Sequence, residues 1–400
     1  MRVIGMIPLL EARFVVHAQT HEANAARTPF QTATARTLRE NVLAPTDFPA
    51  FDRSAVDGYA IRGVGERFQV VAQLGAGAVS PLSLSAGECA RIFTGAMVPP
   101  GTVAVIMQED VDRKGETVVV KQRGEATHIR RRGEDARKGD VLIPSGTRIG
   151  ASEAALLAQI GMLQPLVSPA PRILHLVTGN ELIDPSLPPA PGEIRDSNST
   201  LMAALLTQSG ADLVYQSRCP DSLPELVAAV EKPAADWDVL LISGGASVGD
   251  YDFGARALDE LGFQIHFRKV NIRPGKPLVF ATRGRQIAFV VPGNPVAHLV
   301  TFHLIIQHAL DRLQGNEVPF ALVSVALVSG IPSPPDQRET WSPARVSVCD
   351  GTLSARPLSW QSSGDLCGIG GTNGLLRVPP GSGAHAAGAR LECLLLDHRI

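Results

Sequence analysis

The chain has 400 residues, of which 44% are hydrophobic and 19% charged, so it can bury substantial cores and is not a disordered chain. At roughly 150 residues per domain it should hold two to four domains, which argues against a single small binding module. Its 37 basic and 39 acidic side chains leave a net charge of −2, so no global field attracts nucleic acid or an anionic membrane. Any bound anion must be held by a local pocket.

The first 169 residues combine helical flanks with a β-rich centre. Residues 9–39 and 152–163 show helical patterns, whereas residues 41–140 are rich in Val, Thr, Gly and Pro. We therefore expect a β domain over 46–140 that is inserted into a helical and linker region formed by 1–45 and 141–169. The apolar start of the chain is interrupted by Pro8 and ended by Glu11 and Arg13, so it does not indicate a secretion signal.

Residues 170–320 alternate short apolar, β-rich runs with helical patterns, which is typical of a parallel sheet covered by helices. The expected strands are 172–177, 211–215, 239–242, 264–270, 278–281 and 286–291. The expected helices are 200–208, 224–231 and 295–313. After them, residues 321–400 contain short strands separated by Gly and Pro, expected at 323–328, 345–349, 353–357, 374–378 and 390–396.

The fold class that these patterns predict is multi-domain α/β. A central α/β sandwich with a mostly parallel sheet is joined to an inserted β domain, a helical N-terminal piece and a C-terminal β domain. The uncharged stretch 286–310 is long enough to cross a bilayer, but a strand, a Pro-Gly-Asn-Pro turn and a helix explain it better. His298, His303 and His308 lie five residues apart, so they cannot share one metal and are packing or surface residues.

Ligands of an open α/β sheet bind at the carboxyl ends of its strands. Glycines there permit close backbone approach, helix starts hold phosphate, and cations add charge, so such loops predict a site for an anion. Arg273 and Lys276 supply the positive charge. Four loops carry these features: 178–181, 243–252, 273–277 and 292–295.

Carboxylates of Glu181, Asp250 and Asp252 are expected on the same rim. Carboxylates repel a phosphate unless a hard cation lies between, and Mg²⁺ bound by one or two carboxylates plus phosphate oxygens is the common solution. We therefore infer a Mg²⁺-dependent step at a phosphate ester or anhydride. Any one loop alone is ordinary turn chemistry, but four at one sheet edge favour a functional site. No GxxxxGK[ST] loop is present, so the chain is not a P-loop nucleotidase.

Eight segments then resemble, in order, a known family. They are PAFDRSAVDGYA, RIFTGAMVP, IRRRGED, TGNEL, IRDSN, SGGASVGDYD, KVNIRPGKP and VPGNPV, which together span residues 49–296, and the QSSG segment at 361–364 continues the match. The chain resembles molybdopterin molybdenumtransferases of the MoeA type. Eight ordered segments are far more specific than any single loop.

The resemblance implies the last step of molybdenum cofactor synthesis. Molybdate, a substrate, is inserted into the dithiolene of adenylylated molybdopterin, the adenylate is hydrolysed and AMP leaves, with Mg²⁺ as cofactor. It also implies a cytoplasmic homodimer, with 1–45 and 141–169 as the dimerisation region and a cleft between the sheet domain of one subunit and the inserted β domain of the other. The cysteines fit a reducing cytoplasm, since they are an odd number without a CxxC pair. Further expected partners are the adenylyltransferase and molybdoenzyme-maturation proteins, and neither nucleic acid nor a membrane is expected.

Functional positions of the family carry over residue by residue. The implied catalytic residues are Asp57, Thr94, Asp135, Glu181, Asp252, Lys269, Arg273 and Lys276. The implied substrate contacts are Gly244, Gly245, Ser247, Asp221, Pro292, Asn294, Pro295 and Ser363, and the implied Mg²⁺ ligands are Glu181, Asp252 and Asp221. Three positions depart from the family pattern: Arg273 stands where lysine is frequent, Ala297 where serine is frequent, and Asn180 where aspartate is frequent.

Two alternatives remain open on the sequence. The sheet domain also resembles the molybdopterin adenylyltransferase, which performs the preceding step but needs neither the inserted nor the C-terminal β domain. A non-catalytic scaffold of the same fold is the third reading, and no long linker or fused domain favours it. Release of AMP from adenylylated molybdopterin discriminates between the two enzymes.

Overall fold

The computed structural model of the chain describes all residues except 1–4, 80–81, 246–252, 317, 335–336 and 397–400. The chain splits into two compact units. The first unit comprises Met1–Arg39, Arg148–Gly150 and Leu166–Ile400, and the second comprises Glu40–Thr147 and Ala151–Pro165. The second unit is therefore an insertion into the first.

A six-stranded sheet forms the centre of the first unit, in the order β16-β13-β17-β21-β20-β18. Strands β16, β13, β17 and β21 run parallel, while β20 is antiparallel to both of its neighbours, β21 and β18. The predicted mostly parallel sheet is thus confirmed. The strand bounds are β13 Arg172–Thr178, β16 Asp212–Cys219, β17 Val239–Ser243, β18 Gln264–Lys269, β20 Pro277–Arg283 and β21 Gln286–Val291.

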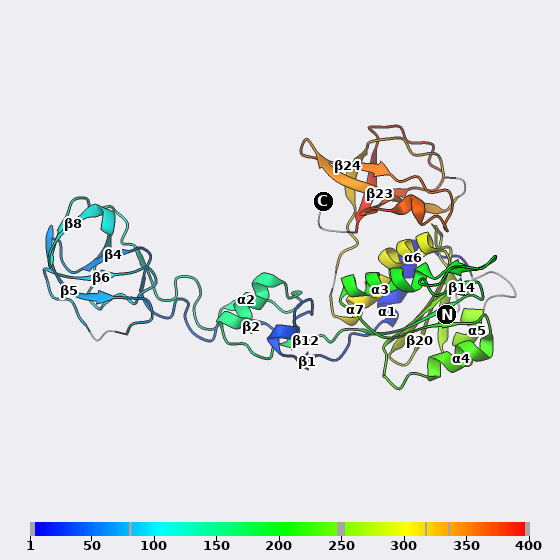
Figure 1. Ribbon diagram of the computed structural model, residues 1–400, viewed down its shortest axis with the longest axis horizontal. Coiled ribbons are helices and arrows are strands. Elements are labelled where there is room, and N and C mark those ends of the chain that lie inside the picture. Colours follow the sequence, from blue (N-terminus) through cyan, green and yellow to red (C-terminus); the bar gives the residue numbers. More distant parts are fainter. Residues whose placement is uncertain (1–4, 80–81, 246–252, 317, 335–336, 397–400) are drawn as a thin grey trace. The chain divides into compact units, whose positions relative to one another are not determined.

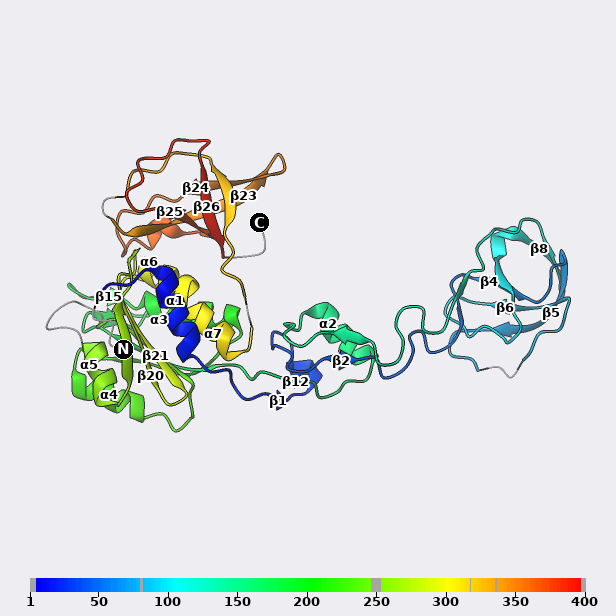
Figure 2. The ribbon, with the colours of Figure 1, turned by 180° about the vertical axis from the view of Figure 1, so that it is seen from behind.

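Helices cover both faces of this sheet (Figures 1 and 2). One face packs against α1, α3, α6, η3 and α7, and the other against α4 and α5. Successive strand residues point to opposite faces, so Leu241 contacts the first group and Leu240 the second. The helix bounds are α1 Leu9–Gln19, α3 Ser197–Ser209, α4 Leu223–Glu231, α5 Phe253–Glu260, α6 Pro295–Thr301, the π-helical η3 Phe302–Ile306 and α7 Gln307–Leu313.

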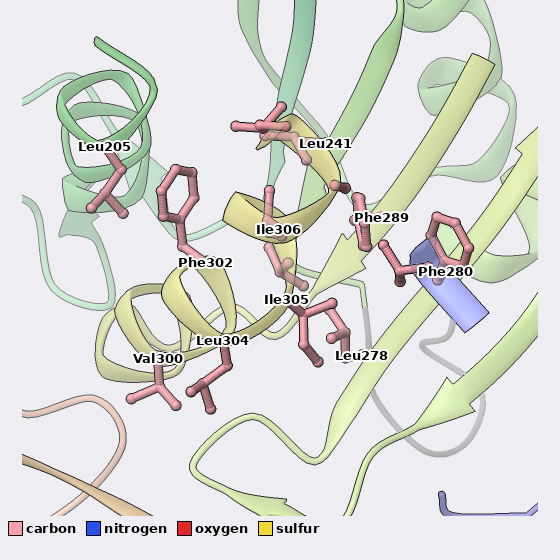
Figure 3. Packing of buried hydrophobic residues seen from close by; sticks show 14 of the residues in the cluster. Leu205, Leu241, Leu278, Phe280, Phe289, Val300, Phe302, Leu304, Ile305 and Ile306 are labelled. Carbon is pink, nitrogen blue, oxygen red and sulfur yellow. The ribbon is translucent and has the colours of Figure 1, made fainter. Parts of the chain in front are cut away.

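The uncharged stretch 286–310 lies inside this core as β21, a turn and the start of the α6–α7 helix. Figure 3 shows Phe302 of η3 beside Leu205 of α3, while Phe280 and Phe289 lie on adjacent strands with ring centroids 5.0 Å apart. Burying a side chain of this size stabilises the fold by about 1.5–3 kcal/mol. No helix within the described residues is long and apolar enough to cross a membrane.

The N-terminal segment differs from its sequence pattern. The helix predicted over 9–39 ends at Gln19, so the prediction is wrong beyond that residue. The following residues instead make a short strand, β1 (Ala26–Arg27), which pairs with β12 (Leu166–Val167). Pro29 then precedes a single 3₁₀ turn, η1 (Phe30–Thr32). Pairing with a distant strand and the backbone restriction imposed by proline outweigh the local helical propensity here.

The C-terminal strands form a second sheet in the first unit. Its order is β19-β23-β24-β22-β26-β25, and an additional β23–β25 pairing closes five of the strands on themselves. The short strand β19 pairs with β23 and so joins this domain to the segment between β18 and β20. The element bounds are β19 Ile272–Arg273, β22 Val323–Leu327, β23 Glu339–Cys349, β24 Thr352–Pro357, η4 Cys367–Ile369, β25 Gly374–Val378 and β26 Arg390–Leu395, with β14 Leu182–Ile183 and β15 Ile194–Arg195 as a separate pair.

The second unit is mostly β structure, as predicted. Its six-stranded sheet has the order β7-β4-β6-β5-β9-β8, and two short pairs, β3–β10 and β2–β11, lie outside that sheet. The helix predicted over 152–163 is α2, Ala151–Gln159. The other bounds are β2 Val42–Leu43, β3 Arg53–Ser54, β4 Gly58–Ile61, β5 Arg67–Leu74, β6 Glu88–Ile92, β7 Ala104–Met107, η2 Gln108–Asp110, β8 Val111–Lys114, β9 Thr117–Val120, β10 Ile129–Arg130 and β11 Val141–Ile143.

Candidate functional site

One edge of the central sheet gathers the loops that the sequence singled out. The parallel strands end together there, since Thr178 is in register with Cys219, and Ser243 with Val291. Because β20 runs antiparallel, its start lies at the same edge, and Lys269 at the end of β18 pairs with Pro277. The segments 178–181, 219–221, 243–245, 276–277 and 292–294 therefore line the same edge of the sheet, in the order of its strands.

The loop after β17 approaches the end of β13 closely. Gly244 has φ +95°, and a Cβ atom there would lie 2.6 Å from the carbonyl oxygen of Thr178 and 2.7 Å from its Oγ1. Only glycine fits this position without a shift of the backbone. The Gly244 N–H donates to the carbonyl of Val291 at 3.0 Å, so the loops after β13, β17 and β21 form one connected rim.

The acidic part of the rim lies at the ends of β13 and β16. The Asn180 N–H donates to Asp221 Oδ2 at 3.3 Å, and the Asp221 N–H donates to Asn180 Oδ1 at 3.2 Å. Asn180, where the family frequently has aspartate, thus joins the two loops through its side chain and its backbone. Glu181 follows directly and is exposed. The structure brings Glu181 and Asp221 to neighbouring loops, while Ser247 and Asp252 lie outside the described residues.

These carboxylates suit a hard cation. Glu181 and Asp221 offer oxygen donors, and Mg²⁺ is usually bound by one or two carboxylates together with substrate phosphates and water. Within the described ranges, no group of three or more His, Cys, Asp or Glu residues could hold a metal ion. Two carboxylates leave the other positions around a Mg²⁺ ion to further oxygen donors, such as water and phosphate.

The cationic part of the rim follows β18. Lys269 is the last residue of β18, Arg273 ends β19, and Lys276 precedes β20. The Arg273 guanidinium lies over the Trp360 ring, 5.7 Å from its centroid, which is within cation–π range. The Lys276 carbonyl accepts from the Val270 N–H at 2.9 Å and closes the turn that carries these side chains.

Gly275 brings the cationic turn against α6. Its φ is +107°, and a Cβ there would lie 2.5 Å from Thr301 Cγ2, so a larger residue would push the turn away from the helix. The hydroxyl of Thr301 donates to the Ala297 carbonyl at 2.7 Å. Ala297, where serine is frequent in the family, is buried in this helix.

The C-terminal β domain contributes to the same rim. The Asn294 amide nitrogen donates to Ser363 Oγ at 2.7 Å, and the Val296 N–H donates to the Ser363 carbonyl at 3.0 Å. Pro295 occupies the first turn of α6, where proline is well tolerated. Pro292, Asn294, Pro295 and Ser363, the implied substrate contacts, are therefore close together.

Two buried polar atoms lie at the base of this rim. Thr178 Oγ1 and Asn198 Oδ1 are buried, and neither has a hydrogen-bond partner in the described part of the chain. The amide nitrogen of Asn198 meanwhile donates to the Gly293 carbonyl at 2.7 Å. Buried polar atoms are normally satisfied, so these two atoms are suited to a polar ligand that reaches the rim.

The second unit holds the other predicted positions. Both the N–H and the Oγ1 of Thr94 donate to Asp57 Oδ1, at 2.8 and 2.7 Å. These bonds, with the nearby Arg91 guanidinium, hold the pKa of Asp57 below its usual range and keep the carboxylate ionised. Thr94 and Asp57 thus form a unit with a fixed, negatively charged oxygen.

Asp135 lies in an ion cluster near this pair. Arg130 binds it directly, and Arg53 lies 4.0 Å away. Strand β3 connects this ion cluster with the Asp57–Thr94 pair. The Ser54 carbonyl accepts from the Gly95 N–H at 2.8 Å, and the neighbouring Arg53 pairs with Arg130 in the β3–β10 ladder. Three segments singled out in the sequence, 51–60, 91–99 and 130–135, therefore meet at β3.

The arginine run at 130–132 leads into an exposed turn whose side chains are nevertheless paired. Its side chains bind acids: Arg131 contacts Asp52 at 2.6 Å, and Arg132 contacts Asp47 at 2.7 Å. The Lys138 backbone N–H, which donates to Asp47, and the Arg132 guanidinium hold the pKa of Asp47 below its usual range. These acids are far from the run in sequence, so its neighbours gave no signal of the pairing.

Sequence reasoning missed a set of buried polar residues under the rim. His175, His298 and Ser243 are all fully buried, and each histidine is hydrogen-bonded to Ser243. Burial lowers the pKa of His175 to about 3 and that of His298 to about 4, so both imidazoles are neutral near pH 7. A single histidine in an apolar strand pattern is the only signal for His175, and it indicates no partner.

Comparison with known proteins agrees with this architecture. Residues 7–161 match the model of the MoeA N-terminal region (domain I and II), 175–312 that of a probable molybdopterin-binding domain, and 325–396 that of the MoeA C-terminal region (domain IV).

Curated relatives and solved structures cover most of the chain. The molybdopterin molybdenumtransferase of Bacillus subtilis is 33% identical over 375 residues, which are 90% of this chain and 87% of the relative. That of a Nostoc species is 36% identical over 366 residues, 87% of this chain and 84% of the relative. The crystal structure of the molybdopterin biosynthesis MoeA protein from Pyrococcus horikoshii superposes with a TM-score of 0.80 at 27% identity, over 98% of this chain and 100% of that chain. The chain therefore belongs to the MoeA family.

Proposed function

We propose that the chain is a molybdopterin molybdenumtransferase that inserts molybdenum from molybdate into adenylylated molybdopterin. Two Mo–S bonds form to the dithiolene, and one oxygen of molybdate leaves as water with the two thiol protons. Water attacks the phosphorus of the adenylate, the phosphoanhydride bond breaks, the bridging oxygen stays with the phosphate of molybdopterin, and AMP is released. The observation that carries the proposal is the rim itself, where carboxylates, cations and two glycine turns line one edge of the sheet. Both substrates are anionic, and the protein as a whole is near neutral, so their attraction must come from a few local cations.

The cationic turn is suited to bind these anions. Lys269, Arg273 and Lys276 lie around one turn at the edge that β18 and β20 share. Lysine presents a compact point charge and arginine a planar fork, so the three residues combine different ways of binding oxyanions. Gly275 keeps the turn against Thr301, the last residue of α6.

Mg²⁺ is part of the proposal. Glu181 and Asp221, together with Asp252, would hold the cation through carboxylate oxygens. When bound, the cation would neutralise charge on the adenylate phosphate and stabilise the bridging oxygen that departs with the phosphate of molybdopterin. The protein's own contribution is to hold the carboxylates on adjoining loops, through the reciprocal Asn180–Asp221 hydrogen bonds.

The decisive experiment measures AMP release by the purified chain. Adenylylated molybdopterin is supplied with and without Mg²⁺ and molybdate, and AMP is quantified by chromatography. We expect AMP release that requires both Mg²⁺ and molybdate. Glu181→Gln should lower that release by at least about 100-fold, because correct placement of the cation stabilises the transition state by several kcal/mol. Glu231→Gln is the matched control, because Glu231 is an exposed glutamate at the end of α4, and it should retain full activity.

Two outcomes would count against the proposal. If AMP release is absent under all conditions, the chain does not perform this reaction. If Glu181→Gln keeps full Mg²⁺-dependent activity, the carboxylate assignment is wrong. Formation of pyrophosphate from ATP and molybdopterin would instead support the preceding adenylyltransferase step.

We also propose that the active form is a homodimer in the cytoplasm. Site residues in both units support this, since Asp57 and Thr94 lie in the second unit and the rim lies in the first. All five cysteines belong to the described residues and are free thiols, which supports a reducing compartment. Light scattering should give about twice the 42.4 kDa of one chain.

Complementation tests whether the two sets of residues act in one site. Inactive Asp57→Ala and Asp252→Ala chains, mixed under conditions that allow exchange, should regain part of the activity. A monomeric mass, or no recovery after verified exchange, would contradict the dimer. The adenylyltransferase and molybdoenzyme-maturation proteins, as supplier and receivers of the cofactor, are the proposed protein partners.

A further inference from the structure

A line of hydrogen bonds with a buried centre, His175, Ser243 and His298, crosses the sheet beneath the rim. We call it the transverse network, and its members are Ser199, Gln216, His175, Ser243, His298 and Asn294. They belong to α3, β16, β13, β17, α6 and the turn before α6. The network therefore connects two helices through three neighbouring strands at the level of the rim.

The bonds are short along the whole line. Gln216 Nε2 lies 3.0 Å from the Ser199 carbonyl and 2.8 Å from His175 Nδ1. His175 Nε2 lies 2.8 Å from Ser243 Oγ, which lies 2.7 Å from His298 Nε2. The line ends where His298 Nδ1 approaches the carbonyl of Asn294 at 3.1 Å.

The Ser199 end fixes the direction of the bonds. A carbonyl oxygen accepts only, so the atom of Gln216 beside it must be the amide nitrogen. The second hydrogen of that nitrogen points to His175 Nδ1, which must therefore be unprotonated. His175 then carries its proton on Nε2 and donates it to Ser243.

The Asn294 end gives the same direction independently. The Asn294 carbonyl accepts only, so His298 Nδ1 must carry the proton of that ring. His298 Nε2 is then an acceptor and receives the hydroxyl proton of Ser243. The serine thus accepts one bond and donates one, and every donor in the line has an acceptor.

The charge state of the histidines agrees with this pattern. Both rings are fully buried, and burial lowers the pKa of each well below 6.5. A protonated His298 would direct a second donor at the serine hydroxyl and lose its bond. The two neutral histidines are therefore in opposite tautomers, His175 with the proton on Nε2 and His298 with the proton on Nδ1.

The network is built to hold position rather than to carry protons. Both ends are backbone carbonyls, which neither release a proton nor take one up at neutral pH. Its middle member, Ser243, directly precedes the Gly244–Gly245 turn. Its last member, Asn294, extends its side chain to Ser363 at 2.7 Å.

We propose that Ser243 is a positioning residue for the substrate-binding rim, acting through the directed hydrogen bonds of the transverse network. It ties the loop after β17 to the turn before α6, so that Gly244, Gly245 and Asn294 are held in one arrangement before substrate arrives. The inference rests on the proposed function for the identity of the substrate. The geometry of the network and the two histidine tautomers do not depend on the proposed function.

The first test reads the tautomers directly. The ¹⁵N chemical shifts of the imidazole nitrogens, in protein labelled at histidine, distinguish a protonated from an unprotonated nitrogen. We expect His175 with only Nε2 protonated and His298 with only Nδ1 protonated near pH 7. Assignment comes from the His175→Phe and His298→Phe variants. Identical tautomers in the two rings, or a charged ring, would overturn the proposed direction.

A surface variant reverses one end of the network without opening the core. Gln216 is exposed, and a carboxylate in Gln216→Glu only accepts, so His175 must move its proton to Nδ1. His175 Nε2 then becomes an acceptor. The Ser243 hydroxyl has one proton, so it can donate to His175 or to His298 but not to both. Gln208→Glu is the control, because it makes the same change at an exposed position of α3. An unchanged His175 tautomer in Gln216→Glu would contradict the argument.

The second test measures function. Ser243→Ala should raise the KM for adenylylated molybdopterin by about tenfold, because two buried ring nitrogens lose their partner and the rim loosens. The kcat should change by a smaller factor. Ser243→Thr keeps the hydroxyl and should recover much of the affinity. Gln216→Glu should show a smaller rise in KM, and Gln208→Glu none.

The outcomes separate this inference from the proposed function. If the wild-type chain releases AMP but Ser243→Ala and Gln216→Glu both keep the wild-type KM, the positioning role is wrong and the function stands. If the tautomers are as expected but the wild-type chain releases no AMP, the function fails while the network is supported. A rise in KM with Ser243→Ala and Gln216→Glu, relieved in Ser243→Thr, supports the inference.

Discussion

Replacing Gly275 by alanine should destabilise the first unit and disturb the cationic turn. Its φ of +107° is unfavourable for any residue with a Cβ atom, which costs about 1–2 kcal/mol. The new methyl would lie 2.5 Å from Thr301 Cγ2, and overpacking of this kind costs about 1–3 kcal/mol. Together the free energy of unfolding should fall by about 2–5 kcal/mol.

A glycine without a close neighbour provides the control. Gly262 has φ +78°, but a Cβ there would meet nothing within 4 Å. Gly262→Ala should therefore cost only the conformational part, about 1–2 kcal/mol. The difference between the two variants isolates the contact with Thr301.

The double variant Gly275→Ala/Thr301→Ser tests the contact itself. Serine keeps the hydroxyl bond to the Ala297 carbonyl but lacks the methyl that the new Cβ would meet. Measured as a double-mutant cycle, the coupling between the two changes should be about 1–3 kcal/mol in the favourable direction.

The assay is urea unfolding followed by tryptophan fluorescence. The three tryptophans, Trp237, Trp341 and Trp360, all lie in the first unit, so their signal reports on that unit. Equal losses in Gly275→Ala and Gly262→Ala, or zero coupling with Thr301→Ser, would refute the reasoning. A higher molybdate requirement in Gly275→Ala is expected as well, because the turn carries Lys276.

Three further predictions concern single side chains. Lys276→Ala should need about tenfold more molybdate for half-maximal insertion, and Lys276→Arg should recover only part of the loss; an unchanged requirement would place the anion site elsewhere. Thr94→Val removes one hydrogen bond to Asp57, so the Asp57 pKa should rise in a ¹³C NMR titration, and an unchanged pKa would contradict this. In the wild type the lowered pKa of Asp57 stabilises the fold above pH 3.8, and this stabilisation is lost as the pH falls through the Asp57 pKa of the folded chain. Exposed Cys349 should react with iodoacetamide at about pH 8 well before Cys393, whose burial raises its pKa to about 12, and equal rates would contradict this.

The fold was predictable because its patterns are local. The apolar run at 239–242 predicted β17, and the helical pattern at 200–208 predicted most of α3. Asp196 caps α3, since its Oδ1 accepts from the Ser199 N–H at 3.0 Å. The error lay at 20–39, where the partner of β1 is β12, about 140 residues away in sequence. No local signal records such a pairing.

The site was predictable in part for the same reason. Loops after parallel strands must share an edge, so the rim followed from the strand order alone. Ser363 could be placed only by resemblance, since its contact with Asn294 depends on how the C-terminal domain packs. The transverse network could not be predicted, because its bonds depend on the register of three strands and on side-chain atoms rather than on spacing.

The long separation between α1 and its packing partners has a consequence for synthesis on the ribosome. Arg13 donates to the Leu304 carbonyl, and His17 stacks on His308 with ring centroids 5.6 Å apart. At roughly 5–20 residues per second, α1 emerges about 15–60 s before those partners are made. An 11-residue helix is marginal by itself in water, so its apolar side chains remain uncovered during that time. Leu9, Ala12 and Val16, which the finished protein buries, therefore stay accessible to water until residues near 310 have been added.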